Sequence, residues 1–248
     1  MSVKFHFLAD KQPKAMNALY ACIKRYGQAD LDKADVVIVL GGDGFMLKIL
    51  QALLNYQTPV FGLNLGHVGH LLNNYSLDNL PDRVAKAQQI HLTPLSVRAK
   101  PFAAKPVEGY VFNDASITRQ SPQAARLTTI ITDEKDLKPV MMQETVFGDG
   151  LLVSTPSGSN GYYASAGGLP FSDAERVIGV KSICSKQNFN PILSENAHIV
   201  VTPQEALKRP VQLDLDGKTR INNIEIALIE SEPRKKKTLL VERKQTTR

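Results

Sequence analysis

The chain has 248 residues, of which 43% are hydrophobic and 22% are charged, so it can bury the core of one large domain or of two smaller ones. Seven basic and two acidic side chains fall in residues 231–248, so most of the formal net charge of +6 belongs to a tail. This argues against a nucleic-acid-binding protein, which carries its basic face on the folded body, and no run of about 20 apolar residues offers a membrane span.

The basic tail is interpreted as solvated or in contact with another subunit. Residues 1–10 contain neither a long apolar stretch nor a small-residue cleavage site, so we expect no signal peptide and a cytoplasmic location. Cys22 and Cys184 are too few for a disulfide framework. The five histidines contain no His-x-x-x-His pair, so we expect no protein metal site.

The first third of the chain alternates strand and helix patterns. The β-branched run at 36–40 is typical of a strand buried on both faces of a parallel sheet. The resulting order implies a Rossmann-like α/β domain over residues 1–92. The expected elements are a strand at 3–9, a helix from Pro13 to Gly27, a strand at 36–40, a helix from about Phe45 to Tyr56, a strand at 59–64 and a helix at 77–89.

After about His91, short alternating segments predict a β-rich, β-sandwich-like domain over residues 93–230. A strand at 238–241 would return to the first domain, so that residues 231–248 belong with it. A short helix is expected after Ser159, and hairpin turns at 133–136 and 216–218. The expected strands are 96–99, 110–118, 127–132, 140–147, 150–154, 198–202, 211–215 and 224–229.

The run Gly41-Gly42-Asp43-Gly44 lies between a buried strand and a helix, at the sheet edge where α/β folds bind ligands. Glycines let backbone amides approach phosphate oxygens, and the helix N-terminus attracts negative charge. Asp43 could then accept a proton from a hydroxyl or orient a metal–phosphate complex. Alternatively, the run is a tight turn with Asp43 as the helix N-cap.

A second run, from Asp149-Gly150 through Ser154 to Tyr163, combines an apolar strand with many small polar residues. Such a loop suits a surface where backbone groups and hydroxyls meet a nucleotide, and Tyr162 could stack on a base. The alternative is an irregular connection with Asp149-Gly150 as a turn. A third feature, Asn113-Asp114, interrupts an otherwise good strand as either a bulge or a ligand-facing pair.

These three features, in this order, resemble the NAD kinase family, as do Gly62 to Gly69 and the run 165–168. The resemblance implies an NAD site between the two domains, with Asp43 as the base that deprotonates the 2′-hydroxyl of the adenosine ribose while it attacks the γ-phosphate of ATP. Polyphosphate is an alternative donor, Mg²⁺ accompanies ATP, and the protein associates as a homodimer or homotetramer.

By the same resemblance, individual positions acquire roles. Gly41, Gly42 and Gly44 approach phosphate, and His70 stands where the family has Phe, so it either stacks on a base, bonds to it, or is a plain surface residue. The NAD-binding residues implied are Gly44, His70, Asn113, Asp114, Asp149, Ser157, Asn160, Gly161, Tyr162 and Ser165.

Two other functions remain open at this stage. The Gly-Gly-Asp-Gly run also occurs in lipid and sugar kinases, so the acceptor could be a lipid or a sugar. The departures at His70, Asn160 and Gly161 also fit a non-catalytic NAD(P)-binding regulator.

Overall fold

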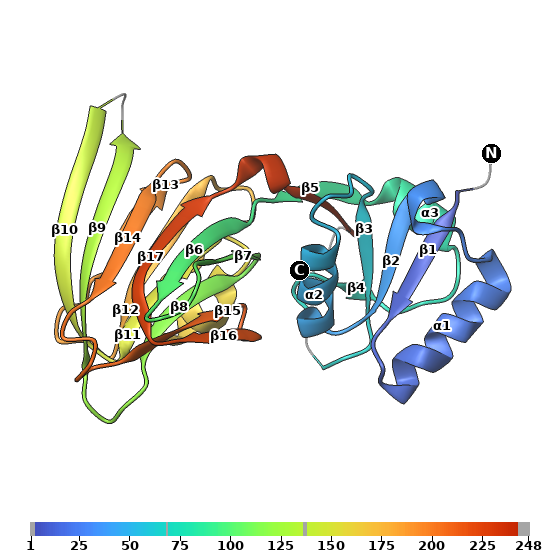
Figure 1. Cartoon of the computed structure of the whole chain (residues 1–248). Helices are drawn as coiled ribbons and strands as arrows, with labels where there is room; N and C mark the ends of the chain where they lie inside the picture. Colours follow the sequence, from blue (N-terminus) through green and yellow to red (C-terminus); the bar gives the residue numbers. More distant parts are fainter. Residues whose placement is uncertain (1–2, 68, 136–137, 243–248) are drawn as a thin grey trace. The chain divides into compact units, whose positions relative to one another are not determined.

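The computed structural model describes residues 3–67, 69–135 and 138–242. The chain forms two compact units, one made of the residues up to Leu92 together with those from Lys235 onward, and the other of Thr93–Arg234 (Figure 1). The second boundary, expected after residue 230, falls after Arg234 because the Glu232 N–H still donates to the Pro94 carbonyl. None of the helices in the described ranges is long and apolar enough to cross a membrane.

The first unit combines a mainly parallel sheet with helices (Figure 1). Its elements are β1 (Phe5–Ala9), α1 (Pro13–Tyr26), η1 (Leu31–Lys33), β2 (Val36–Gly41), α2 (Asp43–Ala52), β3 (Val60–Asn64), β4 (Asn73–Asn74), α3 (Leu80–Lys86), β5 (Gln88–Leu92) and β18 (Lys237–Val241). Paired strands follow the order β1-β2-β3-β18-β5, and β4 pairs with the end of β3. Only the β18–β5 pair is antiparallel.

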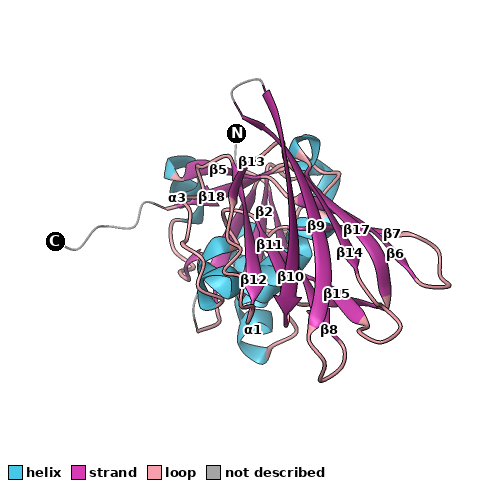
Figure 2. Cartoon of the chain, turned by 90° about the vertical axis from the view of Figure 1, so that its left-hand side faces the viewer, coloured by secondary structure: helices cyan, strands magenta, loops and turns pink. Residues whose placement is uncertain are grey.

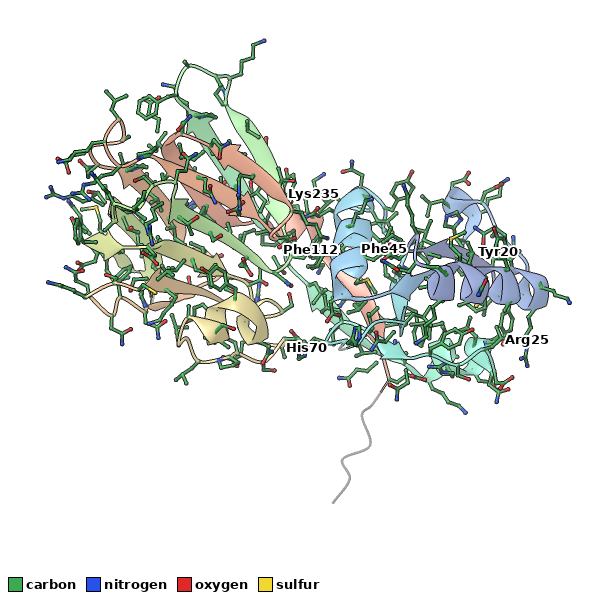
Figure 3. The ribbon with its side chains drawn as sticks, turned by 90° about the horizontal axis from the view of Figure 1, so that it is seen from below. Tyr20, Arg25, Phe45, His70, Phe112 and Lys235 are labelled. Carbon is green, nitrogen blue, oxygen red and sulfur yellow. The ribbon has the colours of Figure 1, made fainter. Side chains whose placement is uncertain are left out.

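Strand β2 is buried along its whole length, as its β-branched run predicted. Helix α1 packs Ala18 and Cys22 against the sheet, and Tyr20 on its other side is exposed to solvent (Figure 3). Burial raises the pKa of the Cys22 thiol to about 11, so this cysteine is an apolar core residue.

Helix α2 begins at Asp43 and ends at Ala52, whereas the pattern predicted a helix from about Phe45 to Tyr56. Gly42 is the N-cap, with extended backbone, and its carbonyl accepts the N–H groups of Phe45 and Met46. Asp43 is therefore the first helical residue and not the cap, so its carboxylate is available for other partners.

The helix expected at 77–89 is shorter at both ends, since α3 begins only at Leu80. Helix α3 ends at Lys86, and residues 88–92 form the edge strand β5, which pairs with β18. The partner strand comes from the far end of the chain, so local periodicity carried no sign of this pairing.

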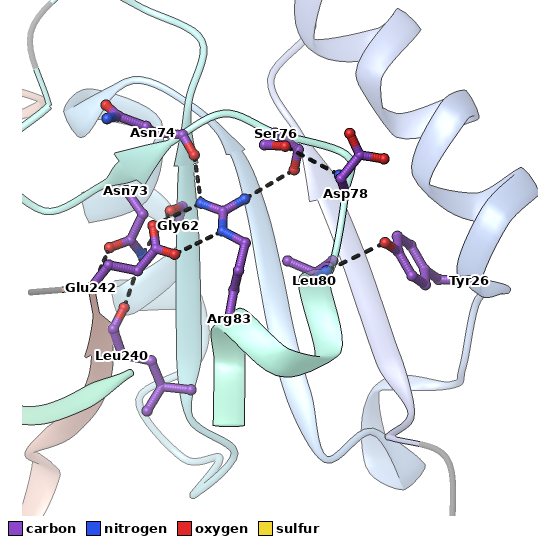
Figure 4. Close-up of polar contacts among 10 residues, drawn as sticks. All are labelled: Tyr26, Gly62, Asn73, Asn74, Ser76, Asp78, Leu80, Arg83, Leu240 and Glu242. Atoms are coloured by element: carbon purple, nitrogen blue, oxygen red, sulfur yellow. Dashed lines mark hydrogen bonds and ion pairs between the residues drawn. The ribbon is translucent and has the colours of Figure 1, made fainter. Parts of the chain in front are cut away.

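Strand β18 joins the first sheet, as expected for residues 238–241, and a polar network fastens it there (Figure 4). The Asn73 side chain donates to the carbonyls of Gly62 (3.1 Å) and Leu240 (3.0 Å) and accepts the Glu242 N–H (2.7 Å). Arg83 forms a two-armed ion pair with Glu242, with both N···O distances 2.7 Å. The end of β18 is thereby tied to both β3 and α3.

The second unit contains two six-stranded sheets within the described residues (Figure 2). Their elements are β6 (Leu95–Pro101), β7 (Val107–Val111), β8 (Asp114–Arg119), β9 (Ala125–Lys135), β10 (Lys138–Gly148), β11 (Gly150–Ser154), η2 (Ser159–Tyr163), β12 (Val177–Ile183), β13 (Ile192–Ser194), β14 (His198–Pro203), β15 (Val211–Leu215), β16 (Thr219–Asn222), β17 (Ile224–Ser231) and η3 (Pro233–Lys235).

One sheet has the order β10-β9-β14-β17-β6-β7, and the other has the order β13-β12-β11-β8-β15-β16. Both sheets contribute alternate residues to one apolar core, for example Val97 and Ile229 from the first and Ile117 and Leu213 from the second. This shared core explains the alternating hydrophobic patterns of the sequence.

The segment 110–118, expected as one strand, is two strands of different sheets. Strand β7 pairs with β6, whereas β8 pairs with β11 and β15. Asn113 lies where the chain passes from one sheet to the other. The interruption at Asn113-Asp114 is therefore a crossing point and not a bulge.

Three strands of the second unit, β12, β13 and β16, were not expected from the sequence, nor was the short β4 of the first unit. The turn at 216–218 joins β15 to β16 as predicted. Of the turn expected at 133–136, residues 133–135 belong to strand β9 instead, and Asp136 lies outside the described residues.

Candidate functional site

The Asp43 carboxylate lies beside the loop that follows β3. Its Oδ2 atom accepts the His70 N–H (3.0 Å), and its Oδ1 atom accepts the Leu71 N–H (3.1 Å). Asp43 is half-buried, and it is the backbone of His70, not its exposed ring, that makes the contact (Figure 3). Two amides thus hold the carboxylate in one orientation.

Glycines allow this loop to approach the Gly41–Gly44 run closely. A Cβ on Gly66 would lie 3.4 Å from the Gly42 Cα, and a Cβ on Gly69 would lie 2.9 Å from the Asn64 side chain. Asn64 in turn accepts the Gly66 N–H (2.9 Å). A Cβ on Gly44 would meet nothing within 4 Å, so the space on this side of the first turn of α2 is open.

In the second unit, the turn around Asn113 is organised by Asp216, at the tip between β15 and β16. The Asp216 carboxylate accepts three successive N–H groups, from Phe112 (3.0 Å), Asn113 (2.8 Å) and Asp114 (3.1 Å). Phe112 itself is fully buried and anchors the turn in the fold (Figure 3).

Hydroxyl groups of the segment after β11 bind the carbonyls of the same turn. Thr155 and Ser157 both donate to the Phe112 carbonyl, at 2.6 and 2.7 Å. Gly158 packs against the backbone of Asn113, since a Cβ there would lie 2.2 Å from the Asn113 carbonyl oxygen. The small polar residues of this run therefore have a structural reason to be there, independent of any ligand.

Two polar side chains of the turn are left with unusual environments. The Oδ1 atom of Asn113 is buried and has no hydrogen-bond partner among the described residues. Asp114 is 9% exposed, and burial, followed by the neighbouring charge of Asp216, raises the pKa of its carboxyl from 3.8 to about 7. Both features favour an external hydrogen-bonding partner.

The residues of the η2 helix divide into core and surface. Tyr163 is buried and donates to Asn190, whereas Tyr162 is 43% exposed. Asn160 and Gly161 are also exposed, and Ser165 donates to the Gly161 carbonyl (3.1 Å). The exposed ring of Tyr162 is the one available for stacking, as expected from the sequence.

Asp149 is not brought together with Asn113 and Asp114. It lies at the start of β11, beside Arg119, with which it forms an ion pair of 2.6 Å, and Asp114 lies opposite Ser154 at the other end of that strand. Partial burial raises the pKa of Tyr162, followed by acidic groups that include Asp114 and Asp149. Tyr162 therefore interacts electrostatically with acidic groups near both ends of strand β11.

Asp216, Arg119 and Asn73 were missed by the sequence analysis. Asp216 carried a signal, because an Asp-Gly turn with a carboxylate at its tip can accept backbone amides, but it was interpreted only as a turn. Arg119 and Asn73 carried none. Arg119 pairs with a residue 30 positions away, and two of the three partners of Asn73 lie 167 and 169 positions away.

Comparison with known sequences shows relatives for both units. Residues 4–87 match the family model of the ATP-NAD kinase N-terminal domain, and residues 114–240 match that of the ATP-NAD kinase C-terminal domain. The NAD kinase of Cereibacter sphaeroides (strain ATCC 17029 / ATH 2.4.9) is 37% identical, over 94% of this chain and 91% of the relative. That of Brucella suis biovar 1 is 31% identical, over 98% and 93%.

Two solved structures share the fold. The yeast NADH kinase complexed with NADH aligns with a TM-score of 0.80 at 20% identity, over 97% of this chain and 84% of that one. An NAD kinase from Archaeoglobus fulgidus in complex with ATP aligns with a TM-score of 0.70 at 22% identity, over 94% and 90%.

Proposed function

This chain belongs to the NAD kinase family, and from this premise we propose that Asp43 is the general base of its reaction. The reaction transfers the γ-phosphate of ATP to the 2′-hydroxyl of the adenosine ribose of NAD and gives NADP. Polyphosphate is the alternative donor. The observation that carries the assignment is the Asp43 carboxylate, which two backbone amides hold at the start of α2.

The two amides orient the Asp43 carboxylate and leave part of its hydrogen-bonding capacity unused. Each carboxylate oxygen has two lone pairs, so each can accept a further hydrogen bond, here from the ribose hydroxyl. Phosphoryl transfer depends mostly on alignment and on neutralising charge, and a fixed carboxylate provides alignment. Gly42 and Gly44 leave space for phosphate oxygens to approach the first turn of α2. Gly41, the third proposed phosphate-binding glycine, is buried at the end of β2, where the Phe45 side chain packs against it.

The adenosine part of NAD is assigned to the turn in the second unit. The unpaired Oδ1 of Asn113 can accept a hydrogen bond from an amino group, and the Asp114 carboxylate can accept one from a ribose hydroxyl. Ser157 already donates its proton to the Phe112 carbonyl, so toward NAD it can only accept. His70, Asp149, Asn160, Gly161, Tyr162 and Ser165 complete the proposed NAD-binding set.

Magnesium is proposed as part of the ATP substrate, held by phosphate oxygens. Across residues 3–67, 69–135 and 138–242, no three His, Cys, Asp or Glu side chains lie together where they could hold a metal ion. The residues present thus do not fit a resident metal, and no step is assigned to one.

The remaining proposals concern context. We propose a cytoplasmic location and a homodimer or homotetramer. For the fold, the β1-β2-β3 order supports a Rossmann-like first domain, and the shared core of two sheets supports a β-sandwich-like second domain. Sedimentation of the purified full-length protein would measure the oligomer.

The test of function is NADP production by the purified full-length protein with Mg²⁺, ATP and NAD, with polyphosphate as a second donor and lipid and sugar acceptors in parallel. We expect NADP with wild type and almost none with Asp43→Asn, while Asp32→Asn, a surface aspartate of the same unit, stays active. Full activity of Asp43→Asn would remove Asp43 from the mechanism. Binding of NAD without turnover by any donor would indicate a regulator instead.

A further inference from the structure

The Asp216 carboxylate accepts the three consecutive backbone N–H groups of residues 112–114, all between 2.8 and 3.1 Å. The contact is reciprocal, because the Asp216 N–H donates to the Asp114 carbonyl (3.0 Å). Asp216 has a φ of 48°, in the left-handed region, which only a few side chains adopt at low cost. Asp is one of these side chains, and four hydrogen bonds connect it to one short segment.

The carbonyl groups of the same segment are also occupied. Thr155 and Ser157 hydroxyls bind the Phe112 carbonyl, and the Thr155 N–H donates to the Asn113 carbonyl (2.9 Å). The buried Oδ1 of Asn113 has no hydrogen-bond partner among the described residues. Because the backbone groups of the turn already bond to protein, the side chains of Asn113 and Asp114 are the groups that could bind a ligand.

We propose that Asp216 is a positioning residue for NAD: it holds the 112–114 turn so that Asn113 and Asp114 present their side chains to the adenosine. The proposal rests on the proposed function of Asn113 and Asp114. Asp216 does not touch the ligand and acts through these two residues.

A carboxylate is required at this position for a chemical reason. It offers acceptor lone pairs on both oxygens, whereas an amide has one acceptor oxygen and an NH₂ group that would face a backbone N–H. After burial, the negative charge of Asp216 is the second cause of the raised pKa of the Asp114 carboxyl. The position therefore influences both the geometry and the ionisation of Asp114.

Other titratable groups also act on this pair. Tyr162 of η2 interacts with Asp114. Burial raises the pKa of the Asp216 carboxyl, while the three backbone N–H groups and then Lys218 of the same turn act in the opposite direction. Asp214 on β15 is engaged in an ion pair with Arg220 (2.7 Å). Strand β11 places the uncharged Ser154 opposite Asp114.

The experiment is steady-state kinetics of the full-length protein with ATP and NAD between pH 6 and 9, for wild type, Asp216→Asn and the control Asp214→Asn. In Asp216→Asn we expect the KM for NAD to rise about tenfold or more, because bonds to a charged acceptor are lost, while kcat changes less than about threefold. Asp214→Asn should leave both close to wild type.

The pH profile separates positioning from a merely structural role. In wild type the KM for NAD should fall as the pH rises through about 7, because ionised Asp114 accepts from the ribose. In Asp216→Asn the neighbouring charge is gone, so this change should move to lower pH. An unchanged KM and an unchanged profile in Asp216→Asn would overturn the proposal.

Two further measurements cover the other outcomes. If Asp216→Asn does not fold, Asp216→Glu replaces it, because this variant keeps the negative charge but moves the carboxylate. In Asp216→Glu the KM for NAD should rise, while the pH at which the KM changes should stay as in wild type. A wild-type KM in Asp216→Glu would reject the proposal. Failure of the proposed function looks different, since wild type itself would then make no NADP.

Discussion

The Asp43 loop of the first unit and the Asn113 turn of the second use the same interaction in opposite ways. In the first, the carboxylate assigned to chemistry accepts the backbone amides itself. In the second, a separate carboxylate, Asp216, accepts the amides, and Asn113 and Asp114 keep their side chains uncommitted. The side chain proposed to act as the base is thus itself fixed by amides, whereas the two side chains proposed to bind NAD are held through their backbone.

The largest effect on activity should come from replacing the Asp43 carboxylate. We expect Asp43→Asn to lower kcat by about 10²- to 10⁴-fold, the range for loss of a general base, with the KM for NAD nearly unchanged. Asn113→Ala should do the reverse and raise KM with a smaller change in kcat. Steady-state kinetics of both variants measures the contrast, and equal changes in KM for the two would contradict it.

The next effect tests the ionisation of Asp114. Its folded pKa of about 7 lies above the ordinary 3.8, so proton binding stabilises the fold; this stabilisation is complete below about pH 3.8 and is lost as the pH rises through about 7. Asp114→Asn has no carboxyl to titrate, so above pH 7 its free energy of unfolding should exceed that of wild type by up to about 4 kcal/mol.

Urea denaturation from pH 4 to 9 measures this difference in the free energy of unfolding. The advantage of Asp114→Asn should grow from about pH 4 to pH 7 and then level off. A difference that does not depend on pH would show that the Asp114 carboxyl titrates normally.

A third effect concerns the packing behind the second arrangement. In Gly158→Ala the new Cβ would lie 2.2 Å from the Asn113 carbonyl oxygen, so the backbone must move, at a cost of about 1–3 kcal/mol. Gly44→Ala is the control, because its Cβ would meet nothing within 4 Å and Gly44 lies within helix α2. Chemical denaturation should show a lower free energy of unfolding for Gly158→Ala but not for the control. Equal decreases in the two variants would contradict the steric argument.

A fourth effect, of about the same size as the third, concerns the Asn73 side chain, close to the Asp43 loop. Asn73→Ala removes three buried hydrogen bonds, to Gly62, Leu240 and Glu242, and should cost about 1–3 kcal/mol through the unsatisfied carbonyls. Asn74→Ala, at the exposed neighbouring side chain, should stay within about 0.5 kcal/mol. Thermal unfolding of both variants is the measurement.

Much of the framework was predictable because its signals are local. The β-branched run at 36–40 predicted a buried strand, the segment 150–154 was predicted with its observed bounds, and the 216–218 turn lies where expected. The roles of Asp43, Asn113 and Asp114 in NAD phosphorylation remain proposals, each supported by its contacts.

By itself, the sequence determined the α/β and β-rich regions, the family, and the candidate residues from Asp43 to Tyr162, because these depend on periodicity and on short motifs. Only the tertiary structure decided that residues 88–92 are a strand, that Asn113 marks a crossing between sheets, and that Asp216 holds that crossing. Each of these depends on a partner distant in the chain, and a hydrogen bond or strand pairing formed across such a distance leaves no pattern in the residues near either end.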